Sequence, residues 1–456
     1  MPTKDPQTTS EPALHAGTTV AMQQAIDAVV WGTPIVSFDA MREAFFRDAG
    51  CEFNDIVFLS RPADWRLRIT TPNASALYVL FMFNSGDGPV ILEVPPAAGA
   101  GLFGSILDAW QVPRADIGPQ GEDAGKGGRF ALLPPDYKGP AIADAIPVPV
   151  PTYNGYGAFR VIPDDASDQA RLRAIALIKK LRVYPFARVA QPPQQVFVDM
   201  AGKLFDGIVS YDERFFASLA RMVDEEPAYL RDAEMLGVLS TFGVEHGRPY
   251  APDPAMRQLL GEAARAARDR FVAMAPDEGS PYWAGRHWRS PSPVGATTGF
   301  TFVTADGLDR TARAMMYFLA CAPPARLGAA SVYLTAFVDA EGNELTGDKV
   351  YRLHVPAHVP AKQFWACTVY AAADAAFMRY SPRVEANSYD TTIVTNEDGS
   401  VELYFGPEPP PGHEANWIYT APNAGWFTMF RFYGPEEPVL DKSWQLPDIE
   451  PYGDVH

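Results

Sequence analysis

The sequence predicts a mainly β protein with a helical insert, in which two antiparallel β-sandwiches flank a set of helices. Between residues 49 and 164, short β-rich runs are separated by Pro and Gly clusters, and the same texture returns after Pro324. Residues 165–275 instead carry apolar side chains at helical spacing. Short strands separated by turn signals roughly every 8–12 residues are typical of antiparallel sandwiches and barrels. A chain of 456 residues is long enough for two or three hydrophobic cores.

The N-terminal part predicts a flexible start followed by two helices. Residues 1–18 are polar, whereas residues 19–48 begin with helical spacing of apolar side chains. Gly32 and Pro34 interrupt that pattern. Because proline removes a helical hydrogen bond and clashes with the preceding turn, we expect the helix to break there and a second helix to follow.

The two β blocks are predicted from strand-forming runs and turn chemistry. The first block, residues 49–164, contains ALYVLFMF and PVILEV. The second block, residues 324–456, contains SVYLTAFVDAEGNEL and TTIVTNEDGSVELYF. Each of the latter places a glycine in an acidic or Asn-containing turn between two alternating runs, which is the pattern of a β-hairpin.

The region between the blocks, residues 165–323, predicts several amphipathic helices. Phe215, Leu219 and Met222 lie on one helical face. The acidic run Asp224-Glu225-Glu226 follows that face and has basic residues nearby, so we interpret it as solvated surface and not as a site.

Charge and cysteine content exclude several classes of partner. The chain has 38 Lys and Arg against 55 Asp and Glu, a net charge of −17, which would repel nucleic acid and anionic lipid surfaces. The three cysteines show no metal-binding or redox spacing, so reduced thiols are expected. The N-terminus has no apolar signal region, and no later run reaches the length of a membrane span. We therefore expect a cytoplasmic protein with no nucleic-acid or membrane partner.

Three sequence motifs resemble cofactor or metal sites but lack the required context. A GxGxxG pattern at 99–104 follows two prolines and precedes no long helix, which favours a glycine-rich hairpin over a dinucleotide site. The run at 121–127 is one residue short of a phosphate loop. His354 and His358 have helical zinc spacing, but Pro356 prevents the helix. We expect neither a cofactor nor a metal.

Two groups of motifs resemble a pair of protein families. The runs FWACTVYAAADAAFMRY, NEDGSVELYFGPEPPPGHEANWIYT and GWFTMFRFYGPEEPVLDKSWQLPDIE resemble the family domain of unknown function 1214. Earlier motifs, TTPN, LY, EVP, LDAW, IG and GRFALLPPDYKG, are similar to domain of unknown function 1254. Together the resemblances cover roughly residues 20–450. They imply two jelly-roll sandwiches, a double jelly roll as in some viral capsids, and a homo-oligomer that is a trimer. They imply no settled activity.

The turn that begins at Thr71 departs from the family pattern and leaves two interpretations open. Relatives usually continue from Thr-Pro-Asn through an Asp and a Thr, whereas this chain has Ser75 and Ala76. Asn73 would form an Asx turn in a structural corner, with Ser75 completing it. Alternatively, Asn73 and Ser75 share one face of the following strand and present a polar pair to a pocket, as candidate catalytic residues.

Polar groups among aromatic residues supply the other candidates. Asp108 lies beside Trp110, where a shielded carboxyl could act as a general acid or base. Arg431 lies within an apolar strand, which predicts either an ion pair, with Asp441 or Glu414, or contact with an anionic ligand. The candidate ligand-binding residues are Tyr78, Trp110, Trp365, Tyr370, Trp417 and Arg431.

Three functional hypotheses follow from this pattern. The first is a metal-independent enzyme that acts on a small hydrophobic or carboxylate-bearing molecule in an aromatic-rich pocket near the sandwich interface, by hydrolysis or by acid–base rearrangement or elimination. The second is a non-catalytic binding or assembly protein whose aromatic residues serve an oligomer interface. The third is a carbohydrate-binding sandwich with stacked aromatic rings. We favour the first.

Overall fold

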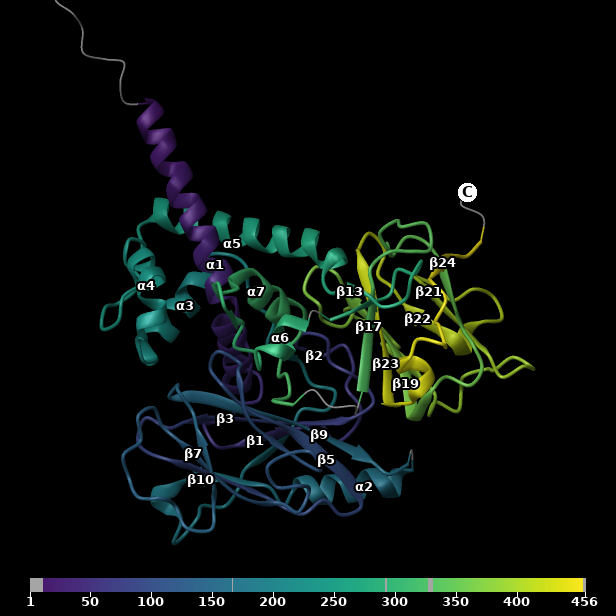
Figure 1. Ribbon diagram of the computed structural model, residues 1–456, viewed down its shortest axis with the longest axis horizontal. Helices are drawn as coiled ribbons and strands as arrows, with labels where there is room; N and C mark the ends of the chain where they lie inside the picture. The colour runs from purple at the N-terminus through teal and green to yellow at the C-terminus, as the bar shows by residue number, and fades with distance from the viewer. Residues whose placement is uncertain (1–10, 166, 292, 327–330, 454–456) are drawn as a thin grey trace, which may run out of the picture.

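The molecule consists of two pairs of β-sheets and a helical region (Figure 1). The computed structural model describes residues 11–165, 167–291, 293–326 and 331–453. Helices α1, α3, α4, α5 and α7 lie above the first sheet pair, whereas α2 packs against the first sheet pair itself (Figure 1). The predicted class, mainly β with several sheets and some helices, is confirmed.

The first sheet pair encloses its own core. A six-stranded sheet has the order β11-β1-β3-β9-β5-β6, and a four-stranded sheet has the order β10-β4-β7-β8. Side chains from both sheets, such as Val79, Phe81, Leu92 and Phe130, bury one another between them. The strands are β1 (Ile56–Phe58), β3 (Leu77–Asn84), β4 (Val90–Val94), β5 (Ala100–Asp108), β6 (Pro113–Ile117), β7 (Gly128–Leu133), β8 (Ile146–Pro149), β9 (Asn154–Pro163), β10 (Arg182–Pro185) and β11 (Phe197–Asp199).

The second sheet pair repeats this arrangement with a separate core. Its six-stranded sheet has the order β13-β14-β17-β23-β19-β20, and its four-stranded sheet has the order β22-β21-β18-β24. Leu334, Leu353, Cys367 and Phe430 lie in the core between them. The strands are β13 (Ser280–Pro281), β14 (Arg289–Ser290), β17 (Ser331–Ala336), β18 (Tyr351–Val355), β19 (Ala361–Ala371), β20 (Glu385–Asn387), β21 (Val401–Gly406), β22 (Trp417–Tyr419), β23 (Trp426–Pro435) and β24 (Glu450–Pro451).

The remaining elements are helices and two short strand pairs. β2 (Leu67–Arg68) pairs with β12 (Phe205–Asp206), and β15 (Val303–Thr304) pairs with β16 (Gly307–Leu308). The α-helices are α1 (Glu11–Arg47), α2 (Asp168–Ile178), α3 (Arg214–Glu225), α4 (Ala233–Ser240), α5 (Pro254–Met274), α6 (Pro293–Thr297), α7 (Arg310–Leu319) and α8 (Glu437–Leu440). The 3-10 helices are η1 (Phe186–Arg188), η2 (Leu230–Asp232), η3 (Ala275–Asp277) and η4 (Glu414–Asn416).

The predicted break in the first helix is wrong, because α1 runs without interruption through Pro34. Buried residues occur on all sides of the helix between residues 25 and 45, as expected for a helix surrounded by protein. A Cβ on Gly32 would lie 3.0 Å from a methyl carbon of Leu219, so glycine allows α3 to pack closely there. The Thr33 hydroxyl donates to the Val29 carbonyl at 2.8 Å. Packing of this extent offsets the roughly 3 kcal/mol that an internal proline costs.

The glycine-rich hairpin predicted at 99–104 is also wrong, because most of this run belongs to β5. Strand β5 pairs with β9 along its length. A Cβ on Gly104 would lie 2.3 Å from the Ala158 carbonyl oxygen, so the glycine serves close strand packing. The cysteines are free thiols, with Cys51 and Cys367 buried and Cys321 partly exposed. Within the described residues, no helix has the length and apolar character needed to cross a membrane.

A third core joins the helices to both sheet pairs. It contains the outward-facing side chains Tyr78, Leu80 and Met82 of β3 together with Tyr370 of β19 and Met429 of β23. The outer faces of the two six-stranded sheets therefore share one hydrophobic core with the helices. This arrangement brings the turn before β3 against β19, β20 and β23.

Candidate functional site

A cavity of about 240 Å³ lies between α1, α3 and α4 and contains one predicted ligand-binding residue, Trp110. Trp31 meets Trp110 edge-on, with ring centroids 4.8 Å apart. Ile35, Met222 and Leu236 extend the apolar wall. We call this the tryptophan cavity. The full lining is Trp31, Ile35, Trp110, Met222, Val223, Glu226, Pro227, Ala228, Asp232, Leu236, Val244, Glu245 and His246.

Glu226 is a buried carboxyl group in the wall of the tryptophan cavity. It follows the last residue of α3 and is 6% exposed. Its Oε2 accepts from the Tyr153 amide at 2.6 Å, and its Oε1 accepts from the Asn154 amide and side chain at 2.9 and 2.8 Å. Burial raises the pKa of Glu226 to about 7, although the three N–H donors act to lower it. A carboxyl group has about four acceptor positions, so one remains on Oε2 for a proton or a ligand.

A buried arginine stands behind the indole wall of this cavity. The Arg313 guanidinium carbon lies 4.9 Å from the Trp110 ring centroid, and Nη2 donates to the Trp31 carbonyl at 2.8 Å. Burial lowers the pKa of Arg313 to about 10, and Asp232 of the cavity wall opposes this effect. The cavity thus combines an aromatic wall with charged groups at its edge.

The predicted catalytic residue Asp108 lies near Trp110 in sequence but does not line the tryptophan cavity. Its Oδ1 accepts from the Val112 amide at 2.9 Å. Its Oδ2 accepts from Arg114, with the Nε contact at 2.9 Å. These bonds connect the ends of β5 and β6, so Asp108 serves as a paired carboxylate within a hairpin.

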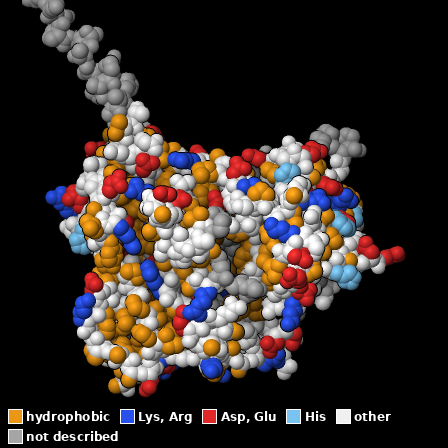
Figure 2. All heavy atoms as spheres, in the orientation of Figure 1, with side chains coloured by type: hydrophobic (Ala, Val, Ile, Leu, Met, Phe, Trp, Pro, Cys, Tyr) orange, Lys and Arg blue, Asp and Glu red, His pale blue; other side chains and the backbone are white. Residues whose placement is uncertain are grey.

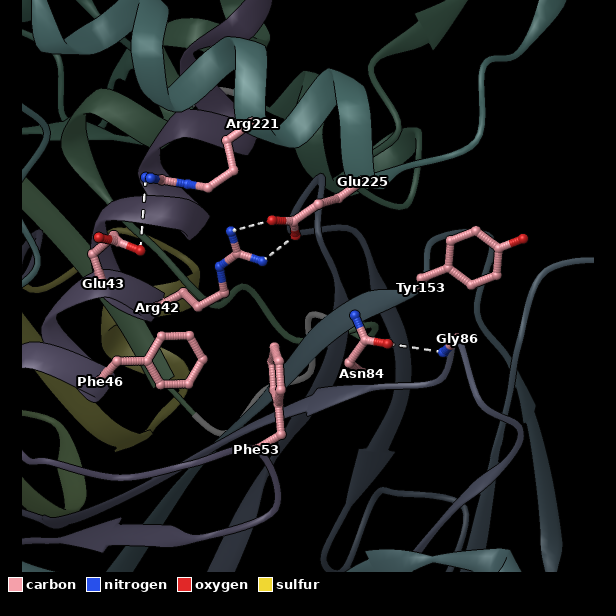
Figure 3. Close-up of a pocket in the computed structure, with 9 residues that line it drawn as sticks. All are labelled: Arg42, Glu43, Phe46, Phe53, Asn84, Gly86, Tyr153, Arg221 and Glu225. Atoms are coloured by element: carbon pink, nitrogen blue, oxygen red, sulfur yellow. Dashed lines mark hydrogen bonds and ion pairs between the residues drawn. The ribbon is translucent and has the colours of Figure 1, made fainter. Parts of the chain in front are cut away.

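A second cavity, of about 380 Å³, lies on the other side of the α3 terminus (Figure 3). We call it the arginine cavity. Arg42 Nη1 contacts Glu225 Oε2 at 2.5 Å, and Arg42 Nη2 contacts Asp39 at 2.7 Å. Arg221 contacts Asp39 at 2.5 Å. The lining residues are Arg42, Glu43, Phe46, Phe53, Asn84, Gly86, Tyr153, Arg221 and Glu225.

Asn154 forms the polar wall between the two cavities. Its Nδ2 donates to Glu225 at 3.0 Å and to Glu226 at 2.8 Å. Its Oδ1 accepts from Arg42 at 3.1 Å and from Asn84 at 3.0 Å. The interpretation of the acidic run as solvated surface is therefore wrong for Glu226. The signal was present in the sequence, because Glu226 continues the buried helical spacing of Leu219 and Met222.

The turn before β3 contains the Asx turn that the structural interpretation predicts. Asn73 Oδ1 accepts from the amides of Ser75 and Ala76 at 3.1 and 3.0 Å. The Asn73 amide donates to the Tyr78 hydroxyl at 3.0 Å. Thr71 has φ +41°, an unfavourable value for a β-branched residue, so this turn is strained.

Residues of the second sheet pair hold the strained turn. Ser75 Oγ donates to Glu385 Oε1 at 2.5 Å, and the Ala74 amide donates to Glu385 Oε2 at 3.1 Å. The Tyr370 hydroxyl donates to the Pro72 carbonyl. Glu385 also accepts from Thr368 at 2.8 Å and from Asn387 at 3.1 Å. The corner is thus a polar contact between the two halves of the molecule, in addition to the ion pair between Arg68 and Asp374.

Arg431 belongs to the same group, and the expected ion pair with Asp441 or Glu414 is wrong. Arg431 is 3% exposed and donates to the Thr368 hydroxyl at 2.7 Å, the Thr71 carbonyl at 3.1 Å and the Tyr370 hydroxyl at 2.6 Å. Arginine supplies these three bonds because its planar guanidinium donates in several directions at once.

The structure therefore brings five of the nine predicted residues together and separates the rest. Trp365 stacks on Phe430 at 5.4 Å within the core of the second sheet pair. Trp417 donates from its indole to the Gly406 carbonyl at 2.9 Å at the edge of the same pair. In the described parts of the chain, no group of three or more His, Cys, Asp or Glu side chains could hold a metal ion. The five residues that meet at the corner are Asn73, Ser75, Tyr78, Tyr370 and Arg431.

Comparisons with known proteins identify both halves of the chain. Residues 53–185 match the family described as protein of unknown function DUF1254, and residues 330–437 match protein of unknown function DUF1214. A search of the curated proteins gave no significant match. The crystal structure of the VPA0106 protein from Vibrio parahaemolyticus is similar over 95% of this chain and 100% of its own, with a TM-score of 0.55 and 17% identity, and so shares the fold.

A crystal structure of a protein from Burkholderia cenocepacia also aligns, over 96% of this chain and 95% of its own, at a TM-score of 0.41 and 11% identity. The two matched segments lie in the first and second sheet pairs, with the helical region mostly between them. This chain belongs to the proteins that combine a DUF1254 domain with a DUF1214 domain.

Proposed function

We propose that this protein is an enzyme that transfers a proton to or from a small, mainly hydrophobic organic molecule in the tryptophan cavity, with Glu226 as the acid–base group. The observation that carries the proposal is a buried carboxyl group in the wall of an aromatic cavity. Ligand sites are usually apolar cavities with a few placed polar groups, and a titrating group with a shifted pKa marks a functional candidate.

Proton transfer by Glu226 fits the chemistry of its surroundings. A general base works best when its pKa lies near the working pH, and burial brings the pKa of Glu226 to about 7. The amides of Tyr153 and Asn154 fix the carboxyl group in one orientation. The indoles of Trp31 and Trp110 supply a flat apolar wall for the substrate. After Glu226 removes a C–H proton, it can return that proton to another carbon of the substrate, which completes a rearrangement, or the electron pair can expel a leaving group of the substrate, which completes an elimination. Hydrolysis would use the same carboxylate to activate water.

The test uses 5-nitrobenzisoxazole, a flat probe with one acidic C–H bond. A base removes that proton, the ring N–O bond breaks, and a nitrile and a coloured phenolate form. We expect wild-type protein to accelerate the reaction by about 10²-fold over buffer, with a rate that rises as Glu226 ionises near pH 7. Glu226→Gln should lose this rate. Glu262→Gln, at the exposed surface of α5 and outside both cavities, should keep it. Equal rates in Glu226→Gln and wild type would refute the proposal.

A second candidate is an assembly protein with a double jelly-roll fold, and one observation favours it. Figure 2 shows hydrophobic side chains gathered at the lower left, over the first sheet pair. Contiguous apolar surface often marks a protein–protein interface. The paired six- and four-stranded sheets support two jelly rolls, and the trimer is what the family resemblance implies. Native mass spectrometry on dilution tests this candidate: a trimer that dissociates and unfolds together supports it, and a stable monomer counts against it.

A further inference from the structure

The two six-stranded sheets face each other across a cluster of arginine and tyrosine side chains. Tyr78 of β3 lies directly opposite Arg160 of β9 in the first sheet. On β23 of the second sheet, Arg431 and Tyr433 share one face, and Tyr333 of β17 lies opposite Arg431. We call these five residues the junction cluster. None of its contacts belongs to the tryptophan or arginine cavity.

Arg160 has no carboxylate partner among the described residues. Its guanidinium forms a side-chain hydrogen bond with the Tyr78 hydroxyl, it takes part in no ion pair there, and its Nε is buried without a partner. The guanidinium carbon lies 5.6 Å from the Tyr78 ring centroid. Burial acts to lower the pKa of Arg160, and the neighbouring groups Tyr78, Tyr333 and Tyr433 act to raise it. Arg160 is nevertheless partly exposed.

Two tyrosine hydroxyls beside Arg160 also lack an acceptor. Tyr433 is 7% exposed, and its hydroxyl is buried without a hydrogen-bond partner in the described chain. The Tyr78 hydroxyl receives a hydrogen bond from the Asn73 amide, so its own hydrogen remains to be donated. Burial raises the pKa of Tyr433 well above its ordinary value, so this hydroxyl stays protonated. The Arg160 Nε and the hydroxyls of Tyr78 and Tyr433 therefore each have a hydrogen to donate, and none of these three hydrogens has an acceptor in the described chain.

The charges of the cluster leave one positive charge unmatched. Arg431 and Glu385 have opposite charges and are connected through the Thr368 hydroxyl, which receives from Arg431 and donates to Glu385. The Glu385 carboxylate is already the acceptor for four donors. Arg160 is the remaining charge. An unmatched guanidinium with unmatched hydroxyl donors is complementary to a single anionic acceptor.

We propose that the junction cluster binds a small monocarboxylate with an aromatic or apolar body, its carboxylate accepting from Arg160 and from the hydroxyls of Tyr78 and Tyr433. One negative charge balances one unmatched positive charge, whereas a phosphate dianion would leave an excess. The rings of Tyr333, Tyr433 and Phe364 supply the apolar surface, with Tyr333 and Tyr433 6.3 Å apart and Phe364 stacked on Tyr433 at 4.2 Å.

The site differs from the proposed active site in position and in chemistry. Glu226 would exchange a proton with an apolar molecule, whereas the junction cluster would hold a carboxylate without reacting with it. The two proposals can therefore fail independently of each other. A ligand bound at the junction would also contact both halves of the molecule, because Tyr78 belongs to the first and Tyr433 to the second.

The test measures benzoate binding by titration calorimetry, with benzamide as the uncharged probe of the same shape. We expect benzoate to bind wild type and benzamide not to bind. Arg160→Met should weaken benzoate binding by about tenfold or more, and Arg214→Met, at an exposed surface ion pair, should have no effect. Tyr433→Phe removes one hydroxyl and should weaken binding several-fold while leaving the cluster packed.

Arg160→Met and Tyr433→Phe test the site independently of each other. If Arg160→Met does not fold, Tyr433→Phe alone distinguishes a site from background. No binding of benzoate to wild type, equal binding of benzamide, or unchanged binding in both variants would each overturn the proposal. Loss of benzoate binding with an unchanged rate on 5-nitrobenzisoxazole in Tyr433→Phe would support the junction site independently of Glu226.

Discussion

Arg42 of α1 and Arg160 of β9 are two arginines that pack near the first sheet pair, and they differ in whether a carboxylate contacts them. Arg42 contacts two carboxylates, Asp39 and Glu225, at 2.7 and 2.5 Å in the wall of the arginine cavity. Arg160 contacts no carboxylate in the described chain and lies against tyrosine. A buried charge that has partners holds the fold together. A charge without a carboxylate partner is instead complementary to an anion supplied by another molecule.

The largest effect is expected for the free energy of unfolding when each of the two arginines is replaced by methionine. Arg42→Met should lower the free energy of unfolding by about 3–5 kcal/mol, because Asp39, with a side chain 1% exposed, loses one of its two arginines. Arg160→Met should change it by less than about 1 kcal/mol, because no acid is left unpaired. Urea unfolding of both variants provides the measurement. Equal destabilisation by the two substitutions would contradict the claim that Arg42 stabilises the fold through its carboxylate partners and Arg160 does not.

Glu226 gives the next largest effect, through the pH dependence of stability. Its pKa is about 7 in the folded protein and near 4.5 in the unfolded chain. The folded state therefore holds the proton more tightly, and stability is greatest below pH 4.5. Between these values the unfolded chain releases its proton first, so stability falls and reaches its minimum above pH 7. The total loss is about 3 kcal/mol.

Glu226→Gln should remove this slope. The amide costs stability by offering a donor to the Tyr153 or Asn154 amides, but it does so equally at every pH. Unfolding free energies of wild type and variant from pH 5 to pH 8 give the comparison, since other titrating groups cancel in the difference. Parallel curves would show that Glu226 ionises normally.

Local sequence patterns were sufficient to predict the β class but not the course of α1. The run SVYLTAFVDAEGNEL contains β17 and a turn in which Val338 bridges Glu344, as the alternation and turn chemistry predict. Pro34 predicts a break from local evidence alone. The contact that overrides it, between Gly32 and Leu219, joins residues nearly two hundred positions apart and cannot be inferred from spacing.

The site predictions were most informative where a polar residue interrupts an apolar strand. Arg431 stood out in WFTMFRFYG, and the structure places it at the junction. The same signal marks Arg160 in NGYGAFRVIP, where one charge lies among strand-forming residues. Trp365 was misleading because alternation along β19 directs it to the inner face, toward Phe430. Aromatic content alone does not distinguish the inner from the outer face of a sheet.

Ser75→Ala should lower the free energy of unfolding by an intermediate amount, and it tests the hydrogen bond that joins the turn before β3 to Glu385. The substitution removes the 2.5 Å bond to Glu385, while Ala74, Thr368 and Asn387 still donate to the carboxylate. Hydrogen bonds to charged groups contribute about 1.5–3 kcal/mol, so we expect a loss of about 2 kcal/mol. Ser75→Thr keeps the hydroxyl and should be near wild type. A neutral result for Ser75→Ala would mean that the halves are held without this bond.

Thr71→Gly should change the free energy of unfolding least, because the substitution has one stabilising and one destabilising consequence. Glycine relieves the strain of φ +41°, which for a β-branched residue costs on the order of 1 kcal/mol or more. The same substitution loses the 2.8 Å bond from the Thr71 hydroxyl to the Leu319 carbonyl and adds freedom to the unfolded chain, which together cost about as much.

The net change for Thr71→Gly should therefore stay within about 1 kcal/mol of zero. Thr71→Val separates the two contributions, since it keeps the strain and loses the hydroxyl, and should be less stable than Thr71→Gly in urea unfolding. The opposite order would mean that the turn is not strained. The corner would then be set by Asn73 and by its partners across the junction.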